Sequence, residues 1–104
     1  MLELRPNCEL CARDLPADSA ATRFCSYECT YCASCVATVL HDVCPTCGGG
    51  FAPRPIRPRA AWREDKKLGL QHHPASSVRR RTSFTIDDIK PHVARIRHLA
   101  PDQR

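Results

Sequence analysis

Residues 24–35 read FCSYECTYCASC and hold four cysteines, Cys25, Cys29, Cys32 and Cys35. So dense a stretch can form one metal site, halves of two metal sites, or a set of disulfides. The fold of the first half of the chain depends on which of these holds, because few large apolar side chains surround the cysteines. A small chain with so little core needs cross-links or metal ions in order to fold.

The chain carries eight cysteines in 104 residues, and all of them lie before residue 48. With Cys8, Cys11, Cys44 and Cys47, the complete spacing is C-x2-C-x13-C-x3-C-x2-C-x2-C-x8-C-x2-C. The residues before Cys8 contain no apolar signal-peptide core, so we expect a cytoplasmic location. In that reducing compartment, paired cysteines bind metal more often than they form disulfides.

Zinc is the metal that this spacing favours. Eight thiolates make two tetrahedral sites, each closed by four cysteines with no position left for water or substrate. An iron–sulfur cluster is the competing interpretation, because Cys29, Cys32 and Cys35 match the first three cysteines of a ferredoxin run. The fourth position of that run is Val39. We therefore predict two structural Zn²⁺ ions per chain.

Two pairings of the cysteines are compatible with the spacing. Val36, Val39, Leu40 and Val43 recur at helical spacing, so the two preceding cysteines should lie at a helix N-terminus, where free amides favour thiolates. A knuckle plus a helix-start pair is the treble-clef way of holding zinc. It favours interleaved sites: Cys8, Cys11, Cys32 and Cys35 (site 1), and Cys25, Cys29, Cys44 and Cys47 (site 2). Sequential pairing, with Cys8, Cys11, Cys25 and Cys29 on one ion, stays open because only about 10 Å of chain separates Cys29 from Cys32.

Three fragments resemble RING-type cross-brace zinc domains: CELC at 8–11, YCASCV at 31–36 and CPTCG at 44–48. Residues 1–58 as a whole are more similar to small bacterial proteins of the domain-of-unknown-function family 1272. That resemblance implies a zinc-binding, RING-like module, and the family carries no established activity. Leu10 lies where RING domains often carry an apolar residue, which can belong to a docking groove. Gly48 lies where active ubiquitin ligases commonly carry arginine, so a ligase-like adaptor is the weaker interpretation.

The chain divides into three segments. Residues 1–51 are the expected RING-like zinc domain, which should fold alone once it holds metal. Residues 52–84 read as a Pro/Arg-rich linker, expected to be disordered because it lacks an apolar period. Residues 85–100 read as an amphipathic helix, with a capping-box spacing from Thr85 to Asp88, although Pro91 fits better in a helix that starts near Asp88. The predicted fold class is thus small zinc-stabilised α+β, a RING-like/treble-clef module followed by a mostly disordered basic tail with one C-terminal helix.

The net charge of +5 conceals a strong asymmetry. Residues 1–51 hold three basic and six acidic side chains, a net charge of −3, whereas residues 52–104 hold thirteen basic and five acidic ones, a net charge of +8. Eight thiolates on two Zn²⁺ ions would make the first half more negative still. The basic tail can therefore face either a polyanion or the protein's own acidic half.

The sequence favours a binding protein over an enzyme. It contains no paired carboxylates, no nucleophile with a base and no phosphate-binding loop, so we expect neither catalysis nor a small-molecule substrate. No stretch is long enough to span a membrane, and we expect no membrane partner. The main hypothesis is a zinc-stapled module that docks an unidentified protein, with Leu10 near the docking surface. The alternative is a nucleic-acid-binding accessory protein that uses the tail residues Arg54, Arg57, Arg59, Trp62 and Arg63.

Overall fold

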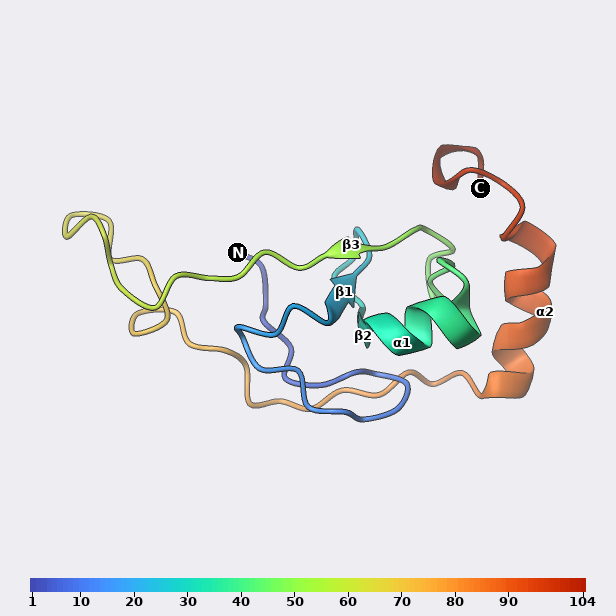
Figure 1. Ribbon diagram of the computed structural model, residues 1–104, viewed down its shortest axis with the longest axis horizontal. Coiled ribbons are helices and arrows are strands. Elements are labelled where there is room, and N and C mark those ends of the chain that lie inside the picture. The colour runs from blue at the N-terminus through green and yellow to red at the C-terminus, as the bar shows by residue number, and fades with distance from the viewer.

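The protein is a small α+β molecule, and the computed structural model describes all of residues 1–104. Its elements are β1 (Thr22–Phe24), β2 (Thr30–Cys32), α1 (Ala33–Cys35), the π-helical turn η1 (Val36–Leu40), β3 (Ala52–Pro53), α2 (Ile86–Ile96) and the 3₁₀ turn η2 (Pro101–Gln103). The molecule is elongated, 48 × 27 × 19 Å, with α2 near one end and a long irregular loop at the other (Figure 1). No helix in it combines the length and apolar character that crossing a bilayer requires.

A three-stranded antiparallel sheet organises the cysteine-rich half, with strand order β2-β1-β3. Strands β1 and β2 form a hairpin in which Thr22 pairs with Cys32 and Phe24 pairs with Thr30. The hairpin turn is closed by a hydrogen bond from the Cys25 amide to the Cys29 carbonyl, at 3.1 Å. The hairpin therefore holds Cys25 and Cys29 at its turn and Cys32 at the opposite end of β2.

The predicted helix after β2 is present, and it begins with the second cysteine pair. Cys32 is the N-cap of α1, with extended backbone angles, and α1 continues directly into η1. The helix ends at Leu40 because His41 and Asp42 both adopt left-handed backbone angles, with φ of 48° and 62°. Val43 therefore lies outside the helix, although it is as buried as its period predicted.

The core joins both halves of the chain. Leu15, Tyr31, Leu40 and Val43 from the cysteine-rich half pack with buried cysteines and with two residues of α2. Those two residues are Ile89 and Val93, which are 1% and 3% exposed. The hydrophobic core thus extends beyond residue 51, the expected end of the zinc domain.

Residues 52–58 and 70–84 follow a defined path along the head, residues 1–51, instead of the disorder expected for residues 52–84. Arg54 is buried, and its guanidinium donates to the backbone carbonyls of Arg5, Leu15 and Pro16. Later in the segment, the Ser76 amide donates to the Leu4 carbonyl. The Thr82 amide donates to the Glu9 carbonyl at 2.8 Å. Hydrogen bonds from the backbone and from arginine side chains hold this segment in place. The prediction of disorder was based on the lack of an apolar period, which a segment held in this way does not need.

Helix α2 starts where its capping box places it. The Thr85 side chain accepts from the Asp88 amide at 3.1 Å, and the Asp88 carboxylate accepts from the Thr85 amide at 2.9 Å. The alternative start near Asp88, inferred from Pro91, is wrong: Pro91 lies inside the helix. Its missing N–H forfeits one helical hydrogen bond, which the cap and the buried face of Ile89 and Val93 offset.

Candidate metal centres

Site 1 brings together the first knuckle and the helix start. The Sγ atoms of Cys8, Cys11, Cys32 and Cys35 all lie within 4.8 Å of one another. Cys11 Sγ and Cys32 Sγ are 3.8 Å apart, too far for the roughly 2.05 Å bond of a disulfide. The N-terminal loop supplies two of these thiols, and the junction of β2 with α1 supplies the other two.

Backbone amides point at the first sulfur of each pair in site 1. The Cys11 amide donates to Cys8 Sγ at 3.5 Å, and the Cys35 amide donates to Cys32 Sγ at 3.4 Å. Ala12 follows with a left-handed φ of 66°, and its own amide donates to the Cys8 carbonyl at 3.0 Å, which closes the turn. Both hydrogen bonds stabilise a thiolate over a thiol, as a cation-binding sulfur requires.

Site 2 gathers thiols from the hairpin turn and from the last knuckle. The Sγ atoms of Cys25, Cys44 and Cys47 lie within 4.8 Å of one another, and Cys29 stands slightly outside this set. The Cys29 thiol still lies within hydrogen-bonding reach of the thiols of Cys44 and Cys25. Site 2 is therefore a triangle of thiols with a fourth beside it.

Backbone amides also point at sulfurs of site 2, from two residues further along the chain instead of three. The Tyr27 amide donates to Cys25 Sγ at 3.3 Å, and the Gly49 amide donates to Cys47 Sγ at 3.3 Å. Gly48 makes the second turn possible, because its φ of 79° is a conformation that residues with a Cβ rarely adopt. All four cysteine pairs thus supply a turn, and each turn directs an amide at a sulfur.

Three thiols of site 2, those of Cys25, Cys29 and Cys44, have pKa values shifted in opposite directions. Hydrogen bonds from the Cys44 and Cys25 thiols lower the pKa of Cys29 to about 6. Burial raises the pKa of Cys25 to about 11, and the hydrogen bond to Cys29 together with burial raises that of Cys44. One thiolate is favoured at the expense of its neighbours, which is the behaviour of anionic groups crowded together without a cation.

A divalent ion with sulfur ligands fits these sites. A tetrahedron with the Zn–S length of about 2.3 Å has S···S edges of about 3.8 Å, which is the separation of Cys11 and Cys32 in site 1. Every donor in both clusters is a thiol, the ligand that zinc accepts in closed structural sites. The thiols group as the interleaved arrangement requires, while the pairing of cysteines on metal ions stays a prediction.

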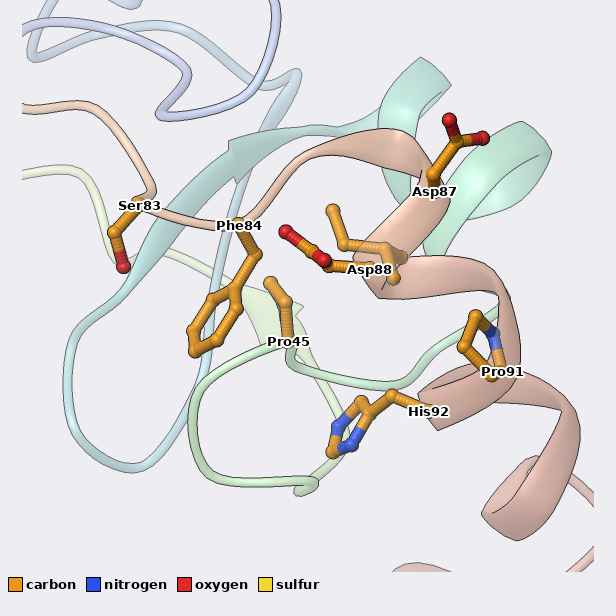
Figure 2. Close-up of a pocket in the computed structure, with 8 residues that line it drawn as sticks. Pro45, Ser83, Phe84, Asp87, Asp88, Pro91 and His92 are labelled. Atoms are coloured by element: carbon orange, nitrogen blue, oxygen red, sulfur yellow. The ribbon is translucent and has the colours of Figure 1, made fainter.

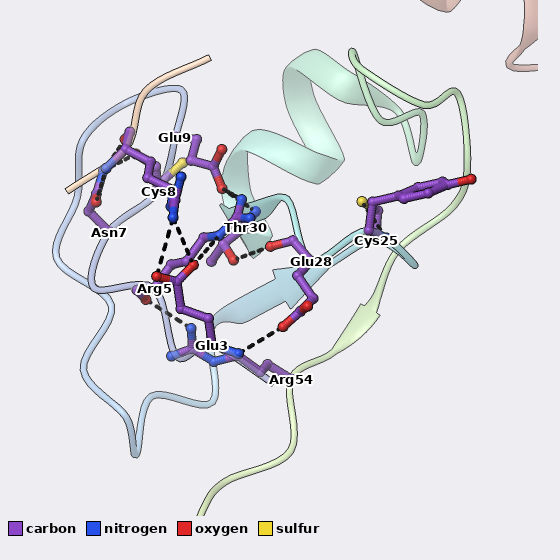
Figure 3. Close-up of polar contacts among 11 residues, drawn as sticks. Glu3, Arg5, Asn7, Cys8, Glu9, Cys25, Glu28, Thr30 and Arg54 are labelled. Atoms are coloured by element: carbon purple, nitrogen blue, oxygen red, sulfur yellow. Dashed lines mark hydrogen bonds and ion pairs between the residues drawn. The ribbon is translucent and has the colours of Figure 1, made fainter. Parts of the chain in front are cut away.

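A buried polar cluster braces the first knuckle against the hairpin (Figure 3). The Glu9 carboxylate accepts from Arg5 Nη1 at 2.9 Å and from the Thr30 amide at 2.6 Å. Burial lowers the pKa of Arg5, but its contacts with Glu9 outweigh that effect and raise it overall. Nothing in the sequence indicates this pair, because an Arg and a Glu four residues apart outside a helix form no recognisable pattern.

The tail residues proposed for partner binding fall into two groups. Arg54 is 5% exposed and cannot meet a partner, since its guanidinium is occupied by three carbonyls, so its assignment is corrected. Arg57 donates to the carbonyls of His73 and Leu2 at 2.8 and 2.7 Å, which makes it a structural residue as well. Arg59, Trp62 and Arg63 are exposed, and Trp62 is 85% exposed.

Leu10 packs partly against the core and lines a groove of about 420 Å³ beside site 1. The other lining residues include Cys11, Cys35, Val39, Phe84 and Ile86. A second groove, of about 250 Å³, continues between η1 and α2 and shares Val39 and Ile86 with the first. The two form one apolar strip, which we call the helix groove.

A further pocket lies at the N-terminal end of α2, on the side of site 2 (Figure 2). It has a volume of about 480 Å³, and its lining includes Pro45, Phe84, Asp87, Asp88 and His92. Two of its polar groups already have partners: Asp88 closes the helix cap, and His92 Nε2 lies 3.1 Å from the Cys44 carbonyl oxygen. The pocket therefore lies between α2 and the second cysteine cluster.

The comparisons with known proteins agree with the resemblance seen in the sequence. The family model described as protein of unknown function, DUF1272, matches residues 1–57. The uncharacterized protein R02474 of Rhizobium meliloti (strain 1021) is 48% identical over 79 residues, which is 76% of this chain and 84% of the relative. That alignment is 22 residues longer than the 57 residues that the family model matches, so similarity continues into the tail. No solved structure gives a significant match. By its cysteine-rich first half and this long alignment, the chain belongs to the DUF1272 family.

Proposed function

We propose that the protein is a zinc-stapled, RING-like binding module that docks another protein and has no catalytic role of its own. Two Zn²⁺ ions, held by Cys8, Cys11, Cys32 and Cys35 and by Cys25, Cys29, Cys44 and Cys47, hold the module together. The observation that carries this proposal is the pair of thiol clusters with amides directed at their sulfurs. Closed four-thiolate zinc sites are structural, because they leave no ligand position for chemistry.

The helix groove is the docking surface that we assign to the module. Cys11 and Cys35 of site 1 line the helix groove, so the shape of the groove depends on the metal. Its apolar residues include Leu10, Val39 and Ile86, and Ile86 is 47% exposed. An exposed apolar strip of this kind on a small protein is characteristic of an interaction site.

The charges around the helix groove favour an acidic partner segment. Arg81 lines one end, Lys90 and Arg97 line the other, and no acidic side chain lines either part. A peptide with apolar residues on one face and carboxylates on its flanks would match both the strip and its basic edges. The neighbouring pocket carries Asp87 and Asp88, so it would repel such a peptide.

The metal part of the proposal is tested by elemental analysis of protein expressed in zinc-replete medium. We expect two zinc ions and no iron per chain. One metal ion per chain, or substantial iron, would contradict the two-site assignment.

The docking part is tested by zero-length carbodiimide cross-linking, which joins lysine amines to carboxylates of a bound partner. The chain has three lysines: Lys90 in the helix groove, and Lys66 and Lys67 in the long loop. In a pull-down with zinc-loaded protein, the partner should cross-link through Lys90 and be lost from the Ile86→Glu variant. The Ile56→Glu variant is the matched control, since Ile56 is exposed to a similar degree and lies far from the groove in sequence. Capture that survives Ile86→Glu would contradict docking in this groove.

A further inference from the structure

The long irregular loop at the end of the molecule opposite α2 has a defined base and a free tip (Figure 1). We call residues 59–69 the arm. Its base is closed by a hydrogen bond from the Leu70 amide to the Pro58 carbonyl at 2.9 Å. Arg57, just before the arm, anchors the base by donating to the carbonyls of His73 and Leu2.

Glycine at position 69 is required for this closure. A Cβ atom there would lie 2.7 Å from the Ala60 carbonyl oxygen, closer than such atoms approach in proteins. The φ of Gly69 is also 98°, which residues with side chains rarely adopt. The two sides of the arm therefore touch at its base. The residues between them form a loop whose shape is set before any ligand binds.

The arm carries four cations without partners. Arg59, Arg63, Lys66 and Lys67 lie on it beside only two acidic residues, Glu64 and Asp65, for a net charge of +2. None of these six charged side chains takes part in the ion pairs of the molecule, which all involve Arg5, Arg79 or Arg80. Most arginines near the head, by contrast, are bound to carbonyls or carboxylates. The cations of the arm are available to a ligand.

Trp62 lies between these cations and is 85% exposed. An exposed indole offers a flat aromatic face with an N–H donor at its edge. A flat aromatic surface among unpaired cations matches single-stranded nucleic acid, in which bases stack and phosphates pair with Arg and Lys. The distance of the arm from the acidic, cysteine-rich half removes the main source of repulsion (Figure 1).

We propose that the arm binds single-stranded nucleic acid, with one base stacked on Trp62 and with phosphates contacted by Arg59, Arg63, Lys66 and Lys67. This activity is additional to the docking of a protein in the helix groove. An anionic membrane is the less favoured ligand, because the turn at residues 64–67 consists entirely of charged side chains. Insertion of such a turn into lipid would bury charge without compensation.

The test uses the zinc-loaded full chain and a fluorescein-labelled oligothymidylate of about 16 nucleotides, the upper end of common site sizes. Trp62 is the only tryptophan, so quenching of its fluorescence reports stacking directly. We expect quenching at low salt, and an affinity that falls with salt with a log–log slope of about 0.7 per phosphate contact. Trp62→Ala should weaken binding at least about fivefold, the lower limit for loss of one stacked base.

A quadruple alanine variant of Arg59, Arg63, Lys66 and Lys67 should lower the salt slope by about three units. Its control replaces Arg13 and Arg95, two exposed cations outside the arm and the helix groove that make no side-chain hydrogen bond or ion pair in the structure, and should change the slope by less than about half a unit. Zinc content is measured for every variant, so a failure of the metal sites is seen separately.

Three outcomes would overturn the proposal. In the first, no quenching of Trp62 occurs at low salt. In the second, the control variant loses as much slope per cation removed as the arm variant, which would mean diffuse attraction by total charge. In the third, vesicles of equal parts phosphatidylcholine and phosphatidylserine shift the Trp62 emission to the blue while the oligonucleotide leaves it unchanged, which would assign the arm to a membrane surface.

Discussion

The role of an arginine in this protein depends on its surroundings in the fold more than on its residue type. Arginines near prolines in a basic tail are typical of a polyanion-binding segment, yet Arg54 is buried and holds three backbone carbonyls. Burial, followed by its neighbour Arg57, lowers the pKa of Arg54, a sign that its charge is compensated only by carbonyl dipoles. No spacing rule in the sequence distinguishes Arg54 from Arg59, because the difference lies in what the folded chain brings near each one.

Arg54→Ala should lower the free energy of unfolding of the zinc-loaded protein by about 1–3 kcal/mol, because buried carbonyls lose their donor. Arg59→Ala, five positions along the chain and exposed, should change it by less than about 0.5 kcal/mol. Urea unfolding followed by circular dichroism measures both. Equal effects of the two variants would show that Arg54 is not the internal contact described above.

At the scale of elements, the cysteine-containing segments were predictable and the connections between them were not. The helix after β2 follows from the apolar period of residues 36–43, and the predicted cap of α2 is confirmed at Thr85 and Asp88. Pro91 misled the prediction of the start of α2, because the penalty for an internal proline was offset by burial of Ile89 and Val93. The path of residues 52–84 depends on backbone hydrogen bonds to distant carbonyls, which leave no periodic signal.

The cap of α2 is open to a direct test at this scale. Thr85→Ala should cost about 0.5–2 kcal/mol, because the Asp88 amide loses its acceptor. The effect should be largest in the hydrogen-exchange protection of α2, with little change in β1 and β2. Ser77→Ala, at an exposed serine of the preceding segment, serves as the control and should leave protection unchanged. Uniform loss of protection over the whole chain would mean that α2 does not unfold as a separate unit.

The same cap makes the stability of α2 depend on pH. Hydrogen bonds from Thr85, chiefly from its backbone amide and secondly from its side chain, lower the pKa of Asp88 below its usual value. A depressed carboxyl pKa adds stability that is present above the unfolded value, near 3.9, and is lost as the pH falls through the folded value. The carboxyl carbon shift of Asp88 should therefore titrate below that of an unfolded-peptide aspartate in the native protein. In the Thr85→Ala variant, which keeps the backbone amide and loses only the side chain, the Asp88 pKa should rise part of the way toward its ordinary value. An ordinary titration of Asp88 in the native protein would contradict the cap.

At the scale of the whole molecule, the two halves of the chain form one folded unit. Ile89 and Val93 of α2 complete a core whose other residues come from before residue 51, and Arg54 reaches into the head from the tail. Residues 1–51 were expected to fold alone with metal, but without α2 they should be less stable than the full chain. A truncated chain of residues 1–51 should bind metal but unfold at lower denaturant concentration than the full chain, since its core lacks two buried apolar residues.

Metal removal should unfold the full chain. Structural zinc contributes roughly 10–16 kcal/mol of apparent free energy per site near pH 7, which exceeds the 5–15 kcal/mol stability of a typical domain once both sites are lost. Because cysteine thiols must lose their protons to bind zinc, stability should also rise with pH. Amide spectra recorded before and after chelation measure the effect, with re-addition of zinc as the control. Dispersed amide signals after complete chelation would contradict the structural role of the metal.

The central claim is that the cysteines of residues 24–35 belong to two interleaved metal sites, and one measurement tests it most directly. Cadmium-113 replaces zinc at thiolate sites, and its coupling to cysteine β-protons identifies the ligands of each ion. We predict two cadmium signals. One should correlate with the β-protons of Cys8, Cys11, Cys32 and Cys35, and the other with those of Cys25, Cys29, Cys44 and Cys47. A cadmium signal that correlates with Cys8, Cys11, Cys25 and Cys29 would establish sequential pairing and contradict the account.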